Sequence, residues 1–207
     1  ERLQEFEAII LRLRPDSVSQ TLNTFGALEG RAQSGNLSMF LAILLLTLGR
    51  FGHDVDRDMQ EWVVCHEKTM NNFGFWGASK GMTHLQFQNG YHQYEIAEYL
   101  GVRWPRINEA KESVVSLADK HCRFAPYPGG GGCYDYDAAF LISFGGECYS
   151  LDHLKVLLAL AAAIISSQNP DGGFAESKFV RPISLSNFLG INLDEAINQV
   201  VFNKQLM

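Results

Sequence analysis

The sequence predicts an all-α fold made of helical hairpins that repeat about every 50 residues. Three observations support this prediction. Phenylalanines recur at separations of 50, 49 and 50 residues, at Phe25, Phe75, Phe124 and Phe174. Each is followed by a loop and an apolar segment that ends near a glycine, and the segment after that glycine is amphipathic with helical spacing. Because 46% of its 207 residues are hydrophobic, the chain can bury one sizeable core, and we expect a single domain over residues 1–207.

The first helix of each hairpin, called here the inner helix, is expected to be apolar on nearly all sides. Inner helices are predicted near residues 37–48, 90–100, 134–144 and 184–189. A glycine directly after the last helical residue is a common stop, and Gly101 fits this role. The segment 37–48 has only 12 residues, whereas a membrane span needs about 20. We therefore expect helices that are buried all round, and no membrane span.

The second helix of each hairpin, the outer helix, carries one apolar stripe, as Val55, Met59 and Trp62 illustrate. Outer helices are predicted near residues 54–70, 105–119, 151–167 and from 193 onward, with one more at 1–13. The helix near 151–167 is apolar on more sides, which indicates that another subunit or further chain covers it. Hairpins of this kind form either an open solenoid or a closed ring, and the fully apolar inner helices favour the ring.

A turn follows the outer helix near residues 151–167, in the segment "QNPDGGF" at 168–174. Its cluster of Asn, Pro, Asp and Gly predicts the turn. We expect Phe174 to fill the space between adjacent hairpins. We expect Gln168 to bond to the end of the preceding helix, where up to about four carbonyls lack a partner.

The segment "QNPDGGF" resembles the Gln-x-x-x-Gly-x-aromatic repeat of squalene and oxidosqualene cyclases, and it is equally similar to repeats of protein prenyltransferase β subunits. "PGGGGCYDYDAAFLI", residues 128–142, is similar to the Gly-rich loop and inner helix that follow such a repeat. The resemblance to this terpenoid cyclase and prenyltransferase superfamily implies an α/α toroid, a ring of inner helices within outer ones. Four inner helices are fewer than such rings contain, so we expect an incomplete toroid whose open edge is covered by a longer natural chain or in a homodimer.

The chain departs from both families at the residues that carry their chemistry. The Asp-x-Asp-Asp motif with which class II cyclases protonate an alkene is absent. The Asp-x-Cys pair that holds zinc in the prenyltransferases appears in reversed order, as Cys133 and then Asp135. Because these residues and the histidines do not present standard ligand spacing, we expect no metal and no cofactor.

The segment at residues 83–101, "THLQFQNGYHQYEIAEYLG", is more polar than an inner helix requires. His92 and Glu95 are three residues apart and share a helical face. A histidine beside a carboxylate can serve as a general acid or base, although the same pair can simply tie one helix to its neighbour. Asp137, on the following inner helix, is the preferred acidic residue of the cavity. We take His92, Glu95 and Asp137 as the candidate catalytic residues.

Further residues near these positions are candidates for substrate binding. The Gly-rich loop 129–132 is either a site of close approach to a ligand or a flexible loop. Aromatic side chains in this region either fill the hairpins or form a wall against a substrate. The substrate-binding candidates are Trp76, His84, Asn89, Tyr91, Tyr134 and Asp135.

Three functional classes are consistent with these residues. The leading one is a terpene cyclase-like or prenyltransferase-like domain that binds a hydrophobic or isoprenoid ligand in a central cavity. The second is a carbohydrate-active lyase or hydrolase, because the segment 83–101 is rich in Asn, Gln, His and Tyr. The third is a non-catalytic interaction scaffold. A net charge of −6 without a basic block argues against a nucleic-acid partner, and a cytoplasmic location is expected.

Overall fold

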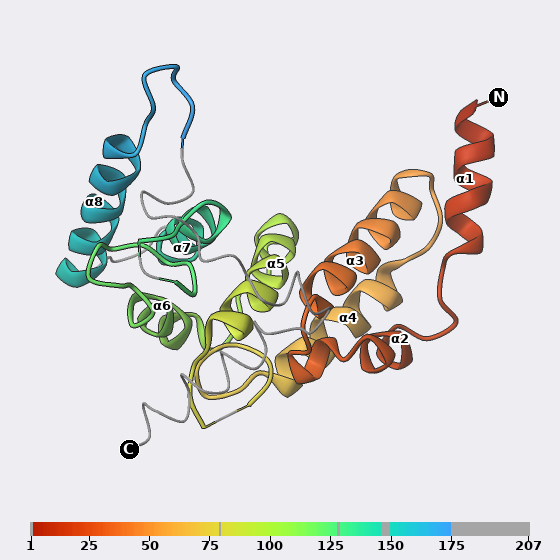
Figure 1. Cartoon of the computed structure of the whole chain (residues 1–207). Helices are drawn as coiled ribbons and strands as arrows, with labels where there is room; N and C mark the ends of the chain where they lie inside the picture. The colour runs from red at the N-terminus through yellow and green to blue at the C-terminus, as the bar shows by residue number, and fades with distance from the viewer. Residues whose placement is uncertain (1, 79, 128, 146–149, 175–207) are drawn as a thin grey trace, which may run out of the picture.

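The computed structural model describes residues 2–78, 80–127, 129–145 and 150–174, and every regular element in this part of the chain is helical (Figure 1). The all-α prediction is confirmed to that extent, whereas the α/α toroid, which we expect to be incomplete, stays a prediction. The elements are α1 (Arg2–Arg12), α2 (Val18–Phe25), the 3₁₀ turn η1 (Ala27–Glu29), α3 (Ser34–Arg50), α4 (Asp56–Thr69), α5 (His84–Leu100), α6 (Ile107–Val115), α7 (Cys133–Ser143) and α8 (Leu151–Ser166). The inner and outer helices predicted near 184–189 and from 193 onward lie outside the described residues.

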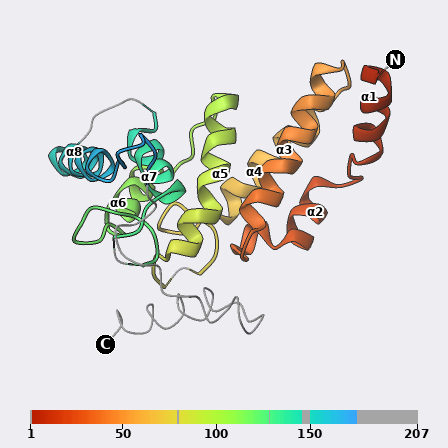
Figure 2. The same ribbon diagram turned by 45° about the horizontal axis from the view of Figure 1, so that its top comes forward.

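Helices α3, α5 and α7 follow one another in both ribbon views and are called the inner row, and α2, α4, α6 and α8 are called the outer row (Figures 1 and 2). In the inner row α3 packs against α5, and α5 packs against α7. In the outer row α4 packs against α2 and α3, while α6 and α8 both pack against α7. The inner row therefore brings three segments together that are far apart in the sequence, and the polar candidates lie on two of its helices.

The N-terminal part differs from the prediction. Residues 1–13 were expected to form an outer helix, but α1 packs against the inner helix α3 and the turn after it. There the ring of Phe6 lies 6.2 Å from that of Phe51, and Glu7 is bonded to His53 at 3.0 Å. The outer position beside α4 belongs to α2, which the sequence analysis did not predict. This helix has only eight residues, too few for a clear apolar period, although Ser17 caps it by accepting from the N–H of Gln20.

The repeat is visible as a recurring turn that starts at Asn71, Asp119 and Asn169. At each of the three, the backbone N–H donates to the carbonyl four residues later, at 2.7, 3.0 and 2.7 Å. The N–H three residues later donates back, at 3.1, 2.9 and 3.0 Å. The positions that carry this returning N–H are Gly74, Cys122 and Gly172, with φ of 80°, 54° and 87°. The turn thus needs left-handed backbone at this position, and the second copy has a cysteine where the others have glycine.

This turn corrects the register of the aromatic repeat. Counted from the start of each turn, the equivalent residues are Trp76, Phe124 and Phe174, rather than Phe75 in the second repeat. Trp76 and Phe124 are buried in the core, and Phe174 is 57% exposed; the hairpin predicted to follow Phe174 lies outside the described residues, so its role between hairpins stays a prediction. Gln168 donates to the carbonyl of Gly172 at 3.1 Å and so stabilises its own turn, not the end of α8.

The predicted burial of the apolar helices all round is also wrong. Because α5 and α4 cover only part of α3, a stripe at Leu37, Phe40 and Ile43 stays exposed. Helix α8 exposes Leu151, Leu158 and Ile165, each by more than 70%. Large apolar patches of this kind usually meet a partner, so the predicted homodimer or additional chain remains an expectation. Within the described residues, no helix combines the length and apolar character that a membrane crossing requires.

Candidate functional site

The first two turns of α5 fix the backbone on which the site is built. Thr83 and Gln86 form a capping box, so the polar segment that begins at residue 83 belongs to the helix from its start. One turn later, Asn89 donates to the carbonyl of Arg31 at 2.9 Å and accepts from the N–H of Gly35. A Cβ at Gly35 would overlap the backbone of Asn89. Helices α3 and α5 therefore meet closely at this point, and Asn89 is explained by helix packing.

Four ionisable side chains gather beyond this contact, three from α5 and one from α7. His92 Nδ1 lies 3.2 Å from Glu95 Oε2, and both side chains are partly exposed. Tyr91 shares side-chain hydrogen bonds with Glu95 and with Tyr136 of α7, and Glu95 also acts electrostatically on Asp137. Tyr91, His92, Glu95 and Asp137 are called the acid–base cluster below. The structure thus brings together the three predicted catalytic residues and one of the predicted binding residues.

Two members of the cluster, Asp137 and Tyr91, have a raised pKa. Asp137 is only 5% exposed, and burial, followed by repulsion from Glu95, raises the pKa of its carboxyl from 3.8 to about 7. Burial also raises the pKa of the Tyr91 hydroxyl far above its ordinary value, with Glu95 as the next cause. Asp137 therefore keeps its proton up to about neutral pH, and it lies behind Glu95 without lining the groove described next.

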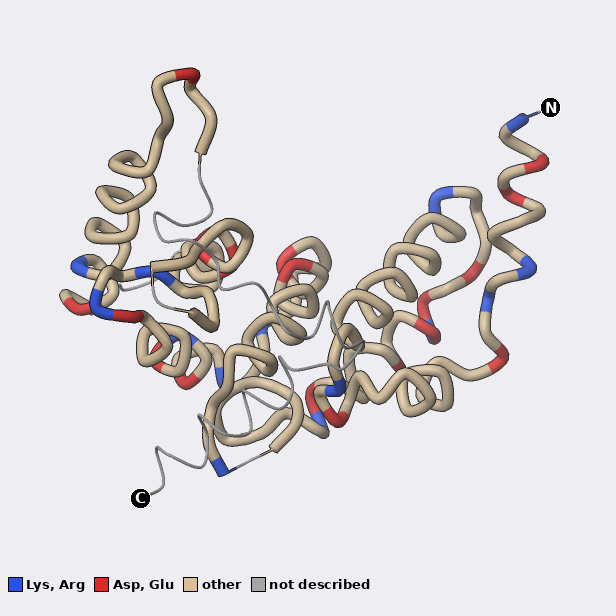
Figure 3. Tube along the Cα trace, viewed as in Figure 1, with Lys and Arg blue, Asp and Glu red and all other residues tan. Residues whose placement is uncertain are grey.

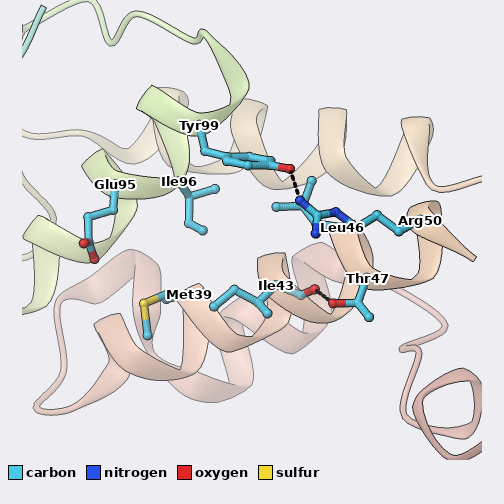
Figure 4. A pocket seen from close by; sticks show the side chains of 8 residues that line it. All are labelled: Met39, Ile43, Leu46, Thr47, Arg50, Glu95, Ile96 and Tyr99. Atoms are coloured by element: carbon cyan, nitrogen blue, oxygen red, sulfur yellow. Dashed lines mark hydrogen bonds between the residues drawn. The ribbon is translucent and has the colours of Figure 1, made fainter. Parts of the chain in front are cut away.

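A groove of about 380 Å³ lies between α3 and α5 (Figure 4). The helices meet near Gly35 and separate toward their C-terminal ends, as Figures 1 and 2 both show. The residues that line the groove are Met39, Ile43, Leu46, Thr47, Arg50, Glu95, Ile96 and Tyr99. We call it the α3–α5 groove. Glu95 belongs both to this groove and to the acid–base cluster, so a molecule in the groove would meet the cluster through that carboxyl group.

The remaining candidates do not join this site. Trp76 is buried, and its indole N–H donates to the carbonyl of His66 at 2.8 Å. His84 is half-buried at the start of α5, where burial lowers its pKa and the backbone of Leu117 is its hydrogen-bond partner. Tyr134 packs against Phe87 with ring centroids 6.4 Å apart. These three residues serve the packing of the described helices and do not line the α3–α5 groove.

Asp135 and the Gly-rich loop are held together by contacts within the protein. The Asp135 carboxylate lies 2.7 Å from Arg123 Nε and accepts from the N–H of Phe124 at 3.1 Å, with both charged side chains buried. A Cβ at Gly131 would overlap this ion pair, and one at Gly130 would overlap the ring of Tyr127. The glycines therefore allow the loop to approach the protein's own side chains, and a role of the loop in ligand binding stays a prediction.

The α3 side of the groove was not predicted, because α3 was expected to be buried all round. Arg50 and Thr47 were the available signal, as polar residues at the end of an otherwise apolar helix. In Figure 3 basic and acidic positions are interspersed along the described chain. Among the described residues, no group of three or more His, Cys, Asp or Glu side chains is arranged to hold a metal ion.

Comparison with known proteins identifies no relative: no protein-family model, curated protein or solved structure matches the chain. The resemblance to terpenoid cyclases and prenyltransferases therefore stays a prediction that rests on its sequence motifs.

Proposed function

We propose that this domain binds a small, largely apolar molecule in the α3–α5 groove and exchanges a proton with it through the acid–base cluster. One observation carries the proposal: Glu95 lines the groove and is also bonded to His92, at 3.2 Å. Ligand sites are typically concave and mostly apolar, with a few polar groups that fix orientation, and the groove has this composition. A hydrophobic ligand is also what the resemblance to cyclases and prenyltransferases implies.

The chemistry follows from the two carboxyl groups. Asp137 is buried and holds its proton up to about pH 7, whereas Glu95 faces the groove beside His92. A positioned side chain can transfer a proton to a ligand that it contacts, and Glu95 is the member of the cluster that lines the groove. In this proposal Glu95 and His92 contact the ligand side, and Asp137 and Tyr91 set the charge behind them.

The binding part is tested with N-phenyl-1-naphthylamine, a neutral apolar dye that becomes fluorescent when it leaves water. Met39→Trp places a larger ring in the groove and is expected to weaken binding by about tenfold, or ~1.4 kcal/mol. Leu3→Trp is the control, since Leu3 is an exposed apolar residue of α1 that does not line this groove. Equal affinity in both variants would contradict the proposed site.

The proton-exchange part is tested by the pH dependence of the same dissociation constant. Wild-type affinity is expected to change across the titration of the cluster, because the ligand displaces water from around Glu95. Glu95→Gln is expected to change this profile, while Glu98→Gln, an exposed control on the same helix, retains it. A profile that is identical in the wild type and Glu95→Gln would refute the acid–base role and leave only binding.

A second function, a carbohydrate-active lyase or hydrolase, is favoured by one separate observation. Tyr136 is 61% exposed at the edge of the cluster, with its ring perpendicular to that of Tyr91 at 6.0 Å. An exposed aromatic ring beside a pair of carboxyl groups is suited to a sugar, and glycoside hydrolysis typically uses two such groups. Saturation-transfer NMR with cellotetraose and with trigalacturonate tests this function. Binding that Tyr136→Ala removes would support it, and no transfer from either sugar would eliminate it for these two substrate types.

A further inference from the structure

The α3–α5 groove has different ends. At one end Glu95 is bonded to His92. At the other end Arg50 donates to the Tyr99 hydroxyl at 2.9 Å (Figure 4). The side chains of Ile43 and Ile96 line the groove between these ends. On α3 the lining extends from Met39 to Arg50, and 50 − 39 = 11 helical steps of about 1.5 Å give roughly 16 Å. The groove therefore offers a cation, an apolar middle and a carboxyl group in that order.

Arg50 is a positively charged side chain in a groove that is otherwise mostly apolar. No carboxylate of the described residues forms an ion pair with it, and its hydrogen-bond partner is the neutral hydroxyl of Tyr99. An arginine at the last turn of a helix also interacts favourably with the helix dipole, but that role does not require it to line a groove. A guanidinium presents donors in a fixed fork that matches a carboxylate or a phosphate.

From this geometry we infer that the ligand is an amphiphile with an anionic group, a carboxylate or a phosphate, that binds Arg50 and Tyr99. Its apolar part then lies along Ile43 and Ile96 and ends at Glu95. The reverse orientation would bring the anionic group against the Glu95 carboxyl group, so the charges also set the direction of binding. The inference deepens the proposed function and rests on it for the choice of site.

The test compares two dyes with similar aromatic groups. 8-Anilinonaphthalene-1-sulfonate carries an anionic group, and N-phenyl-1-naphthylamine lacks it. Arg50→Gln is expected to weaken binding of the sulfonate by about tenfold, as loss of a charged hydrogen bond does, and to leave the neutral dye nearly unchanged. Arg50→Lys keeps the charge and is expected to retain most of the affinity. Arg57→Gln makes the same change of net charge at an exposed position of α4 and serves as the matched control.

The outcomes separate this inference from the proposed function. Equal loss in Arg50→Gln and Arg57→Gln, or no loss in Arg50→Gln, would overturn the inference. Sulfonate binding that survives Met39→Trp would place the dye elsewhere and overturn it too. Competition by decanoate and by decyl phosphate then identifies which anionic group is preferred. If Arg50→Gln weakens binding of the sulfonate but Glu95→Gln leaves the pH profile of the dissociation constant unaltered, the anionic ligand is supported and the proposed proton exchange is refuted.

Discussion

Replacing Asp137 by Asn is expected to stabilise the fold at alkaline pH. The buried carboxyl has a pKa of about 7 in the folded protein and about 3.8 when unfolded, a difference of roughly three pH units. Each unit corresponds to about 1.4 kcal/mol, so the wild type loses about 4 kcal/mol as pH rises from 4 to beyond 7. The direction follows because the folded state retains its proton through this window while the unfolded state has released it. The side chain of Asn does not titrate, so the unfolding free energy of Asp137→Asn should not show this decrease with pH.

Urea unfolding of the wild type and Asp137→Asn at a series of pH values from 4 to 8.5 measures this effect. The difference in unfolding free energy between the two should change by about 4 kcal/mol in favour of the variant across this range. Glu98→Gln is the control, because its exposed side chain should leave the pH dependence as in the wild type. A constant difference between Asp137→Asn and the wild type would refute the argument that Asp137 is a carboxyl group held protonated by its site.

Two other predictions concern the core and the repeated turn. His66 is buried, with Nε2 3.0 Å from Ser38 Oγ, and burial lowers its pKa from 6.5 to about 4. The wild type should therefore lose about 3 kcal/mol of unfolding free energy as pH falls from 6.5 to 4, because only the unfolded state takes up the proton in this range. Urea unfolding of His66→Gln should not show this loss. Cys122→Gly should raise the unfolding free energy by about 0.5 kcal/mol because φ is 54° there, whereas Gly74→Ala at φ 80° should lower it by about 1 kcal/mol or more. A Cys122→Gly variant less stable than the wild type would contradict the strain argument.

Helices α3 and α7 could be predicted from the sequence as apolar segments with a glycine near their ends, and the more polar α5 was predicted from Gly101, the glycine that ends it. The acid–base pair could also be predicted, since His92 and Glu95 are three residues apart on one helix and their meeting needs only helical geometry. Asp137 was harder to assign, because its place beside Glu95 depends on how α7 packs against α5. Local spacing therefore identified the residues, and tertiary packing determined which of them meet.

The predicted site residues that lie away from the groove have a common physical explanation. Asp135, Asn89 and Trp76 were candidates because they are polar or aromatic, but each satisfies a partner that is distant in the sequence or in a neighbouring turn. A single sequence does not reveal that Asp135 meets Arg123 or that Asn89 meets the backbone of Arg31. The groove was missed for the same reason, since it exists only because α3 and α5 meet near Gly35 and then separate.

The most direct test of the account is an NMR titration of protein labelled at its methionine methyl groups and histidine rings, with N-phenyl-1-naphthylamine as the ligand. Met39 lines the α3–α5 groove, His92 reports on the acid–base cluster, and Met59 is a buried core residue that serves as the reference. The account predicts that the signals of Met39 and His92 shift together with one dissociation constant while Met59 stays in place. A shift of Met39 without His92, or of neither, would contradict the claim that Glu95 couples the groove to the cluster.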